Sequence, residues 1–195
     1  FARSGRFRAA RHHHCRPALR YFRDVQSAIA CFCTNHSVFS IYFFNIVKVL
    51  PGEAVFQGAG IPHAYLEGQT MELMANSDNV LRGGLTPKHI DIPELIKHTT
   101  FEGIIPNIMK GDDPGNGEKN YPCPVPDFGI SKIELTGAQT LSSTSASLEI
   151  ITVMDGILRV NDLPLKKGET CAILPGETYR LSTPGNVLAY KAFVP

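Results

Sequence analysis

"SLEIITVMDGILRV", residues 147–160, is the stretch of sequence that decides the fold class. Aliphatic and β-branched side chains dominate it on both sides of Asp155-Gly156. Such residues favour β-strands, and an Asp-Gly pair between two such runs signals a tight turn. The stretch therefore predicts two short strands that follow one another directly.

The same pattern extends in both directions. Toward the C-terminus, strand-like runs are separated by Lys167-Gly168, Pro175-Gly176 and Pro184-Gly185, and from Val38 onward similar short runs also end at glycines. Short strands punctuated by glycine about every ten residues are typical of a barrel or a jelly roll. The predicted fold class is therefore mainly β.

One turn motif occurs twice. Pro51-Gly52-Glu53-Ala54 in the first half and Lys167-Gly168-Glu169-Thr170 in the second each lead into another strand-like run. This cadence is typical of cupins, which are small jelly-roll β-barrels. It predicts two units of the same kind along the chain.

Only "DIPELIKHTT", residues 91–100, has the pattern of a helix. Asp91 is a suitable N-cap, Pro93 and Glu94 fall in the first turn, and Leu95 and Ile96 supply a small apolar face. We predict a short helix over residues 92–99.

Composition excludes several classes of protein. The chain has 195 residues, 43% of them hydrophobic and 19% charged, and a net charge of +1. That charge makes no case for a nucleic-acid or membrane partner, and no apolar run reaches the roughly 18 to 20 residues that cross a bilayer. Five cysteines at irregular spacing do not form a disulfide framework, so we predict a reducing, cytoplasmic setting.

The charge is unevenly distributed. Residues 1–36 hold seven arginines, no lysine and one acid, for a net charge of +6, whereas the other 159 residues carry −5. His12, His13 and His14 are adjacent and would point to opposite faces of a strand, so we interpret them as a solvated run. We expect residues 1–37 to be disordered or not to belong to the fold.

The signature of a known family lies in two adjacent segments, "PGEAVFQGAGIPHAYLEG" (51–68) and "MELMANSDNVLRGGLTPKHID" (71–91). Together they resemble the signature region of the type I phosphomannose isomerases, also called mannose-6-phosphate isomerases. The resemblance runs from about Val38 to Pro195. It implies a zinc enzyme, built from cupin barrels and a helical part, that interconverts mannose 6-phosphate and fructose 6-phosphate through an enediolate.

The resemblance also implies roles for individual residues. His63 matches the zinc-binding histidine and Arg82 the catalytic arginine of the family. The positions that line the family's substrate pocket are matched by Tyr65, Glu72, Asp78 and Lys88. The expected partner is thus a small sugar phosphate, and the sequence does not predict an oligomeric state.

Residue chemistry is compatible with these roles but leaves alternatives open. Arg82 precedes Gly83-Gly84, and a fixed guanidinium suits the oxyanions that form during aldose–ketose isomerisation. Glu72 either contacts sugar hydroxyls, shuttles a proton, or forms a structural ion pair with Arg82. Lys88 either meets the phosphate as a point charge or is a solvated loop lysine. Asp78 falls in a turn and is expected to support the site.

The implied zinc site is incomplete in this sequence. A catalytic zinc has at least three protein ligands, and the family's other ligands are a Gln-x-His pair and a glutamate. The sequence has no Gln-x-His and no glutamate upstream of the signature segments, so three of the four expected ligands are not found. We therefore interpret the chain as a fragment that is inactive alone. Two alternatives remain: a metal-free cupin that binds a sugar phosphate, and a purely structural β module.

The resulting organisation has four parts. After residues 1–37, we expect a partial catalytic cupin over 38–110 with the short helix, a loop linker over 111–128, and a C-terminal cupin over 129–195. In the C-terminal cupin, Thr178 and Tyr179 fall where metal-binding cupins often have a histidine. We therefore expect packing residues rather than chemistry in that barrel.

Overall fold

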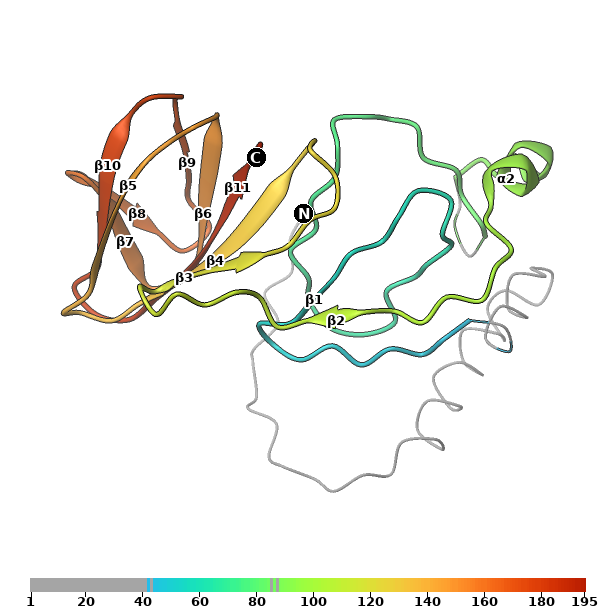
Figure 1. Cartoon of the computed structure of the whole chain (residues 1–195), viewed down its shortest axis with the longest axis horizontal. Helices are drawn as coiled ribbons and strands as arrows, with labels where there is room; N and C mark the ends of the chain where they lie inside the picture. Colours follow the sequence, from blue (N-terminus) through green and yellow to red (C-terminus); the bar gives the residue numbers. More distant parts are fainter. Residues whose placement is uncertain (1–41, 43, 85, 87) are drawn as a thin grey trace, which may run out of the picture.

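The computed structural model describes residues 42, 44–84, 86 and 88–195 (Figure 1). The prediction for residues 1–37 lies outside the described residues. Of the strand-like run expected from Val38, residues 44–49 are described and do not form a strand, so that part of the prediction was wrong.

The described residues are mainly β with one helix, as predicted. The helix is α2 (Ile92–His98), and the strands are β1 (Ala54–Val55), β2 (Ile108–Met109), β3 (Glu118–Tyr121), β4 (Gly129–Leu135), β5 (Thr140–Thr144), β6 (Glu149–Asp155), β7 (Ile157–Val160), β8 (Leu163–Lys166), β9 (Thr170–Ile173), β10 (Thr178–Ser182) and β11 (Val187–Phe193).

Strands β3 to β11 form a two-layered β-sandwich at one end of the molecule (Figure 1). One sheet has the order β3-β4-β11-β6-β9 and the other β5-β10-β7-β8. Every pairing is antiparallel, and β11 lies at the centre of the larger sheet between β4 and β6. We call this unit, residues 118–195, the C-terminal barrel.

The core of the C-terminal barrel follows from the alternation of its strands. In β4 and β6, side chains at every second position point inward, and Ile133, Ile151 and Val153 are completely buried. Leu158 and Leu181 meet them from the opposite sheet and are equally buried. Because the period of a strand is two, a single alternating pattern is enough to build this apolar interior.

The repeated turn motif adopts one geometry in both halves. At the first copy, Glu53 N–H donates to Leu50 O (2.9 Å) and Leu50 N–H donates to the Glu53 carboxylate (2.8 Å). At the second, Glu169 and Lys166 make the same two bonds, at 2.9 and 2.7 Å. The glycine of each turn has a φ of 86° and 84°, which favours glycine over residues with a side chain. The sequence motif therefore encodes a specific turn.

Three strands of the C-terminal barrel have no counterpart among the predicted runs. β3 lies within residues 111–128, where we expected only a loop, and pairs with β4. β5, "TLSST", is polar, and β8 contains Pro164, which lacks an N–H. β8 lies at the edge of its sheet, where a proline is tolerated. These strands are specified by their neighbours more than by their own composition.

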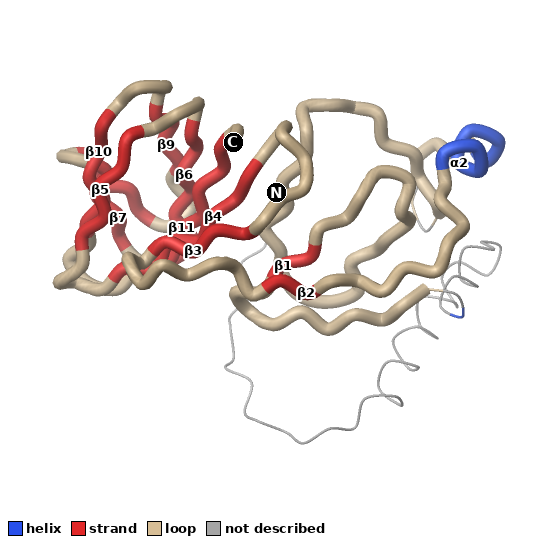
Figure 2. The backbone as a smooth tube through the Cα atoms, in the orientation of Figure 1, coloured by secondary structure: helices blue, strands red, loops and turns tan. Residues whose placement is uncertain are grey.

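The first half departs most from expectation. The short strand-like runs that we predicted from Val38 onward do not form strands over residues 63–84, and that prediction was wrong. Figure 2 shows residues 44–110 as a long looped chain with only β1, β2 and α2. A strand needs a neighbour to satisfy its N–H and C=O groups, and the described residues offer none there.

Helix α2 forms as predicted and ends one residue earlier, at His98. The Asp91 carboxylate accepts from Glu94 N–H at 3.0 Å, which satisfies one free donor of the first turn. Glu94 in turn pairs with Lys97 and His98 at 2.7 and 3.0 Å. None of its residues is fully buried: of the expected apolar face, Leu95 is half-buried and Ile96 is 56% exposed. No helix in the described part is long and apolar enough to span a bilayer.

Candidate functional site

His63 follows a glycine bend that is anchored to the end of α2. Gly60 has a φ of 77°, its carbonyl accepts from Thr100 N–H at 2.8 Å, and an added Cβ would come within 2.6 Å of His98 O. A side chain is therefore excluded at this position. The bend carries the chain into Pro62 and His63, so the glycine fixes where the histidine emerges.

The His63 ring is exposed and oriented by one hydrogen bond. Its Nδ1 lies 3.0 Å from Ile61 O, so Nδ1–H is the donor to this carbonyl. That tautomer leaves Nε2 with a free lone pair. A backbone carbonyl on one ring nitrogen is the usual way to present the other nitrogen to a metal.

Tyr65 lies beside His63. The two rings meet edge to face, with centroids 5.9 Å apart and an interplanar angle of 74°. The pKa of Tyr65 is raised, first by partial burial and then by the carboxylate of Glu72. Tyr65 therefore contacts one predicted site residue, His63, and lies near a second, Glu72.

Among the described residues, no hydrogen bond or ion pair joins the other three predicted residues to this group. Asp78 lies in a turn, where its carbonyl accepts from Val80 N–H at 2.7 Å, in keeping with a supporting role. Arg82 and Lys88 are exposed, and neither forms an ion pair within the part of the chain that the structure describes. The ion pair between Glu72 and Arg82, left open by the sequence, is not formed there.

The described residues fit one ligand of a zinc site and not a whole site. His63 presents Nε2, but no group of three or more His, Cys, Asp or Glu side chains comes together among the residues that the structure describes. A catalytic zinc requires three protein ligands. No chemical step is therefore derived through zinc from these residues.

A second polar cluster lies inside the C-terminal barrel. Lys191 Nζ on β11 is 2.8 Å from the Glu118 carboxylate of β3 and 3.7 Å from that of Glu149 on β6. All three side chains are about nine-tenths buried. Burying an unpaired charge costs a large amount of free energy. Here one ammonium group neutralises two carboxylates.

Tyr179 and Ser131 complete this cluster. The Tyr179 hydroxyl donates to Glu149 at 2.6 Å and accepts from Lys191 at 3.3 Å, and Ser131 donates to Glu118 at 2.5 Å. Burial first, and then the hydrogen bond to Glu149, raises the pKa of Tyr179 to about 12. The cluster joins both sheets, because Tyr179 lies on β10 and the others on the larger sheet.

Our sequence reasoning missed this cluster, since we expected only packing residues in the barrel. The sequence did contain a pattern that could have predicted the cluster. Glu149 is in phase with Ile151 and Val153, and Lys191 with Ala189, so both charges occupy inward positions of apolar strands. A charge in phase with core residues predicts a buried pair.

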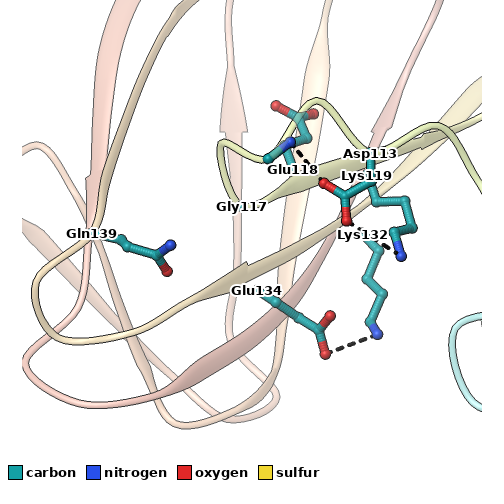
Figure 3. A pocket seen from close by; sticks show the side chains of 8 residues that line it. Asp113, Gly117, Glu118, Lys119, Lys132, Glu134 and Gln139 are labelled. Atoms are coloured by element: carbon teal, nitrogen blue, oxygen red, sulfur yellow. Dashed lines mark hydrogen bonds and ion pairs between the residues drawn. The ribbon is translucent and has the colours of Figure 1, made fainter.

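A shallow polar groove of about 230 Å³ opens beside β3 and β4 (Figure 3). Lys119 and Lys132 line it, and both are already paired, with Asp113 at 3.5 Å and with Glu134 at 2.8 Å. Both lysines of the groove are therefore paired with carboxylates of the same chain, and neither is free to bind an anion.

Comparison with known proteins identifies relatives over most of the chain. No family model matches it. The mannose-6-phosphate isomerase of Escherichia coli (strain K12) is 43% identical over 148 residues, which cover 74% of this chain and 38% of that protein. The mannose-6-phosphate isomerase of Bos taurus is 36% identical over 170 residues, or 79% of this chain and 40% of that protein.

Solved structures give the same result. The apo form of mannose 6-phosphate isomerase from Salmonella typhimurium matches with a TM-score of 0.74 and 34% identity, over 93% of this chain and 46% of that one. The chain thus spans less than half the length of the relatives that it matches, as a C-terminal part would. By sequence and by fold, it belongs to the mannose-6-phosphate isomerase family and corresponds to the C-terminal part of those proteins.

Proposed function

We propose that this chain carries one wall of an aldose–ketose isomerase site that interconverts mannose 6-phosphate and fructose 6-phosphate. The observation that carries the proposal is the contact of Tyr65 with His63, with Glu72 near Tyr65, in the segment that resembles the family signature. The names of the relatives support the reaction class.

The reaction assigns distinct work to the residues of this wall. Moving a proton between adjacent sugar carbons creates an enediolate, whose oxygens need positive charge as it forms. We assign that role to Arg82, and the substrate phosphate to Lys88. Glu72 accepts hydrogen bonds from sugar hydroxyls. The Tyr65 hydroxyl donates to the Glu72 carboxylate and so fixes its orientation.

His63 is proposed as one ligand of a zinc centre whose other ligands are not found in this sequence. Zinc, when bound, would act as a Lewis acid on the sugar oxygens. One ligand does not hold the ion tightly. We therefore propose that the 195-residue chain by itself has little or no isomerase activity.

The first experiment combines elemental analysis and kinetics on the purified chain. We expect zinc well below one ion per chain and no turnover of mannose 6-phosphate, with or without EDTA. One zinc ion per chain, together with turnover that EDTA abolishes, would contradict the proposal that the zinc site is incomplete. It would show that other residues of the chain supply the missing ligands.

A second experiment separates the isomerase wall from a metal-free sugar-phosphate binder. Fructose 6-phosphate is titrated by calorimetry into the parent chain, Arg82→Ala, and the control Arg159→Ala, which removes an exposed arginine of the C-terminal barrel. The metal-free binder would be favoured if Arg82→Ala weakens binding by more than about tenfold while Arg159→Ala leaves it unchanged. Binding would also have to be the same with and without EDTA. No binding by any form agrees with an incomplete wall.

The cytoplasmic setting predicted from the cysteine pattern stays a proposal. The two cysteines in the described part, Cys123 and Cys171, are free thiols, which supports it. Burial raises the pKa of Cys171, so this thiol is kept in its unreactive protonated form.

A further inference from the structure

The loop that leads into β3 contains an asparagine directly followed by a glycine. Asn116-Gly117 is the only such pair in the 195-residue sequence, and Asn116 is exposed. Its Oδ1 accepts from Glu118 N–H at 3.0 Å, and the Asp113 carboxylate just upstream accepts from Gly115 N–H at 2.9 Å. The side-chain amide of Asn116 is therefore held against the backbone of the two residues that follow it.

Packing of β3 against β4 requires the glycine at position 117. Gly117 has a φ of 91°, and an added Cβ would come within 2.5 Å of the Leu135 side chain and 2.9 Å of Glu134 O. Its carbonyl also accepts from Glu134 N–H at 2.8 Å. A residue with a side chain is therefore excluded here. As a result, no side chain at position 117 shields the backbone nitrogen that follows Asn116.

The contacts of Asn116 favour attack of that nitrogen on its side chain. The Gly117 nitrogen and Asn116 Cγ are close enough along the chain to close a small ring. Negative charge then develops on Oδ1, to which Glu118 N–H already donates, as a donor in an oxyanion hole would. Among the described residues, the structure shows no hydrogen bond of Gly117 N–H or of Asn116 Nδ2. Neither the attacking nitrogen nor the leaving amide group is therefore held back.

We propose that Asn116 is a site of spontaneous deamidation, with water as the only co-reactant. The Gly117 nitrogen bonds to Asn116 Cγ, the Cγ–Nδ2 bond breaks, and Nδ2 leaves as ammonia with the proton of Gly117 N–H. Water then opens the resulting cyclic imide. Cleavage between the nitrogen and Cγ leaves aspartate, whereas cleavage between the nitrogen and the main-chain carbonyl carbon leaves isoaspartate. Nothing is oxidised or reduced in either step.

The two products should affect the C-terminal barrel differently. An aspartate carboxylate accepts the Glu118 N–H as the amide oxygen does. In isoaspartate the main chain runs through Cγ and is longer by a carbon atom, directly before a glycine that has no room to shift. Glu118 follows at once and pairs with buried Lys191 at 2.8 Å. Isoaspartate at position 116 is therefore expected to disturb the start of β3 and this ion pair.

The test ages the full chain at mildly alkaline pH, with and without urea. Peptide mass mapping, with chromatographic separation of the isoaspartyl form, follows each asparagine. Asn116 in the folded chain should convert at least about tenfold faster than Asn107 and Asn186. Those two residues are exposed as well, but they precede Ile108 and Val187, whose branched side chains hinder the attack. Asn116→Gln is the matched control and should stay unmodified over the same period, because the longer side chain closes its ring more slowly.

Urea unfolding then separates the effects of the products. Asn116→Asp should unfold at the same urea concentration as the parent chain, and the purified isoaspartyl form at a lower one. Conversion of Asn116 only in urea, or no faster than that of Asn107 and Asn186, would overturn the proposal. Equal stability of the isoaspartyl and parent forms would overturn the expected disturbance of β3. Deamidation needs neither zinc nor a sugar phosphate, so its outcome is independent of the proposed isomerase activity.

Discussion

At the residue scale, Lys191 shows how one charge organises a barrel interior. Its ammonium lies between two buried carboxylates, Glu118 at 2.8 Å and Glu149 at 3.7 Å, from strands on either side of β11. Burial alone lowers the pKa of Lys191. The hydrogen bond to Glu118 and the negative charge of Glu118 are the largest of the effects that raise it, and the pKa of Lys191 is raised overall. The ammonium is therefore retained inside the barrel because the carboxylates are there.

Replacing Lys191 should be among the most destabilising changes in the chain. Lys191→Met leaves two buried carboxylates without a cation, and breaking a buried ion pair from one side costs about 3–5 kcal/mol. The measurement is urea unfolding followed by circular dichroism. Lys167→Met is the control, because Lys167 and Asp155 form an exposed pair at 3.8 Å worth at most about 1 kcal/mol. Equal stabilities of the two variants would contradict the role of the cluster.

The same residues predict a loss of stability in alkali. The pKa of Lys191 is raised and that of Tyr179 rises to about 12, whereas unfolded chains titrate near 10. Above about pH 10 the unfolded state therefore releases protons that the folded state still holds, and the free energy of unfolding falls with pH. Both contributions are complete below about pH 10 and are lost as pH rises through the folded pKa values.

Urea unfolding at a series of pH values up to about 12 measures this slope. Tyr179→Phe removes one of the two groups and should make the decline shallower. A parent chain whose stability is flat across this range would rule out the assigned protonation states.

At the scale of elements, one turn chemistry serves both halves of the molecule. The carboxylates of Glu53 and Glu169 each accept a backbone N–H three residues upstream, at 2.8 and 2.7 Å. A third turn, at Leu174–Glu177, repeats the backbone bond at 3.2 Å, and the structure records no hydrogen bond of the Glu177 side chain there. The glutamate is therefore part of the turn at the first two positions.

This difference makes Glu169 and Glu177 a matched pair. Glu169→Ala should destabilise the C-terminal barrel by about 1 kcal/mol, because Lys166 N–H loses its carboxylate acceptor. Glu177→Ala should change it by less than about 0.5 kcal/mol, as for ordinary surface substitutions. Thermal or urea unfolding measures both, and a larger cost at Glu177 would show that the turn glutamates act in another way.

At the scale of the whole molecule, the chain divides into a packed barrel and a looped half. Within the described residues, the whole buried core lies in the barrel, while the described part of residues 44–108 makes few backbone hydrogen bonds. Tyr121 ties the two together, since its hydroxyl donates to Gly52 O at 2.7 Å. Cooperative stability follows burial of apolar surface, so the two parts should open separately.

Amide hydrogen exchange tests this division on the full chain. We expect slow exchange in β4, β6 and β11, and exchange close to that of an unfolded chain over residues 63–84, where no backbone ladder forms. Strong protection of residues 63–84 in the isolated chain would show that the looped half is stable by itself.

Much of the fold followed from local sequence. The aliphatic and β-branched runs on both sides of Asp155-Gly156 predicted β6 and β7, and Asp91 with Pro93 predicted α2. The glycine-glutamate motif predicted its own turn. Each of these features depends on neighbours a few residues away. The same reasoning missed β3, β5 and β8, which owe their strand conformation to partners distant in sequence.

The candidate site divides in the same way. The sequence by itself determined the family and the residue types of the proposed isomerase wall, since these depend on side-chain identity. Only the tertiary structure decided that Tyr65 lies against His63 and near Glu72, and that Arg82 forms no ion pair with Glu72. It also decided that Glu118, Glu149 and Lys191 share one barrel interior. The physical reason is that burial and charge pairing depend on which strands become neighbours, and that is settled by long-range packing.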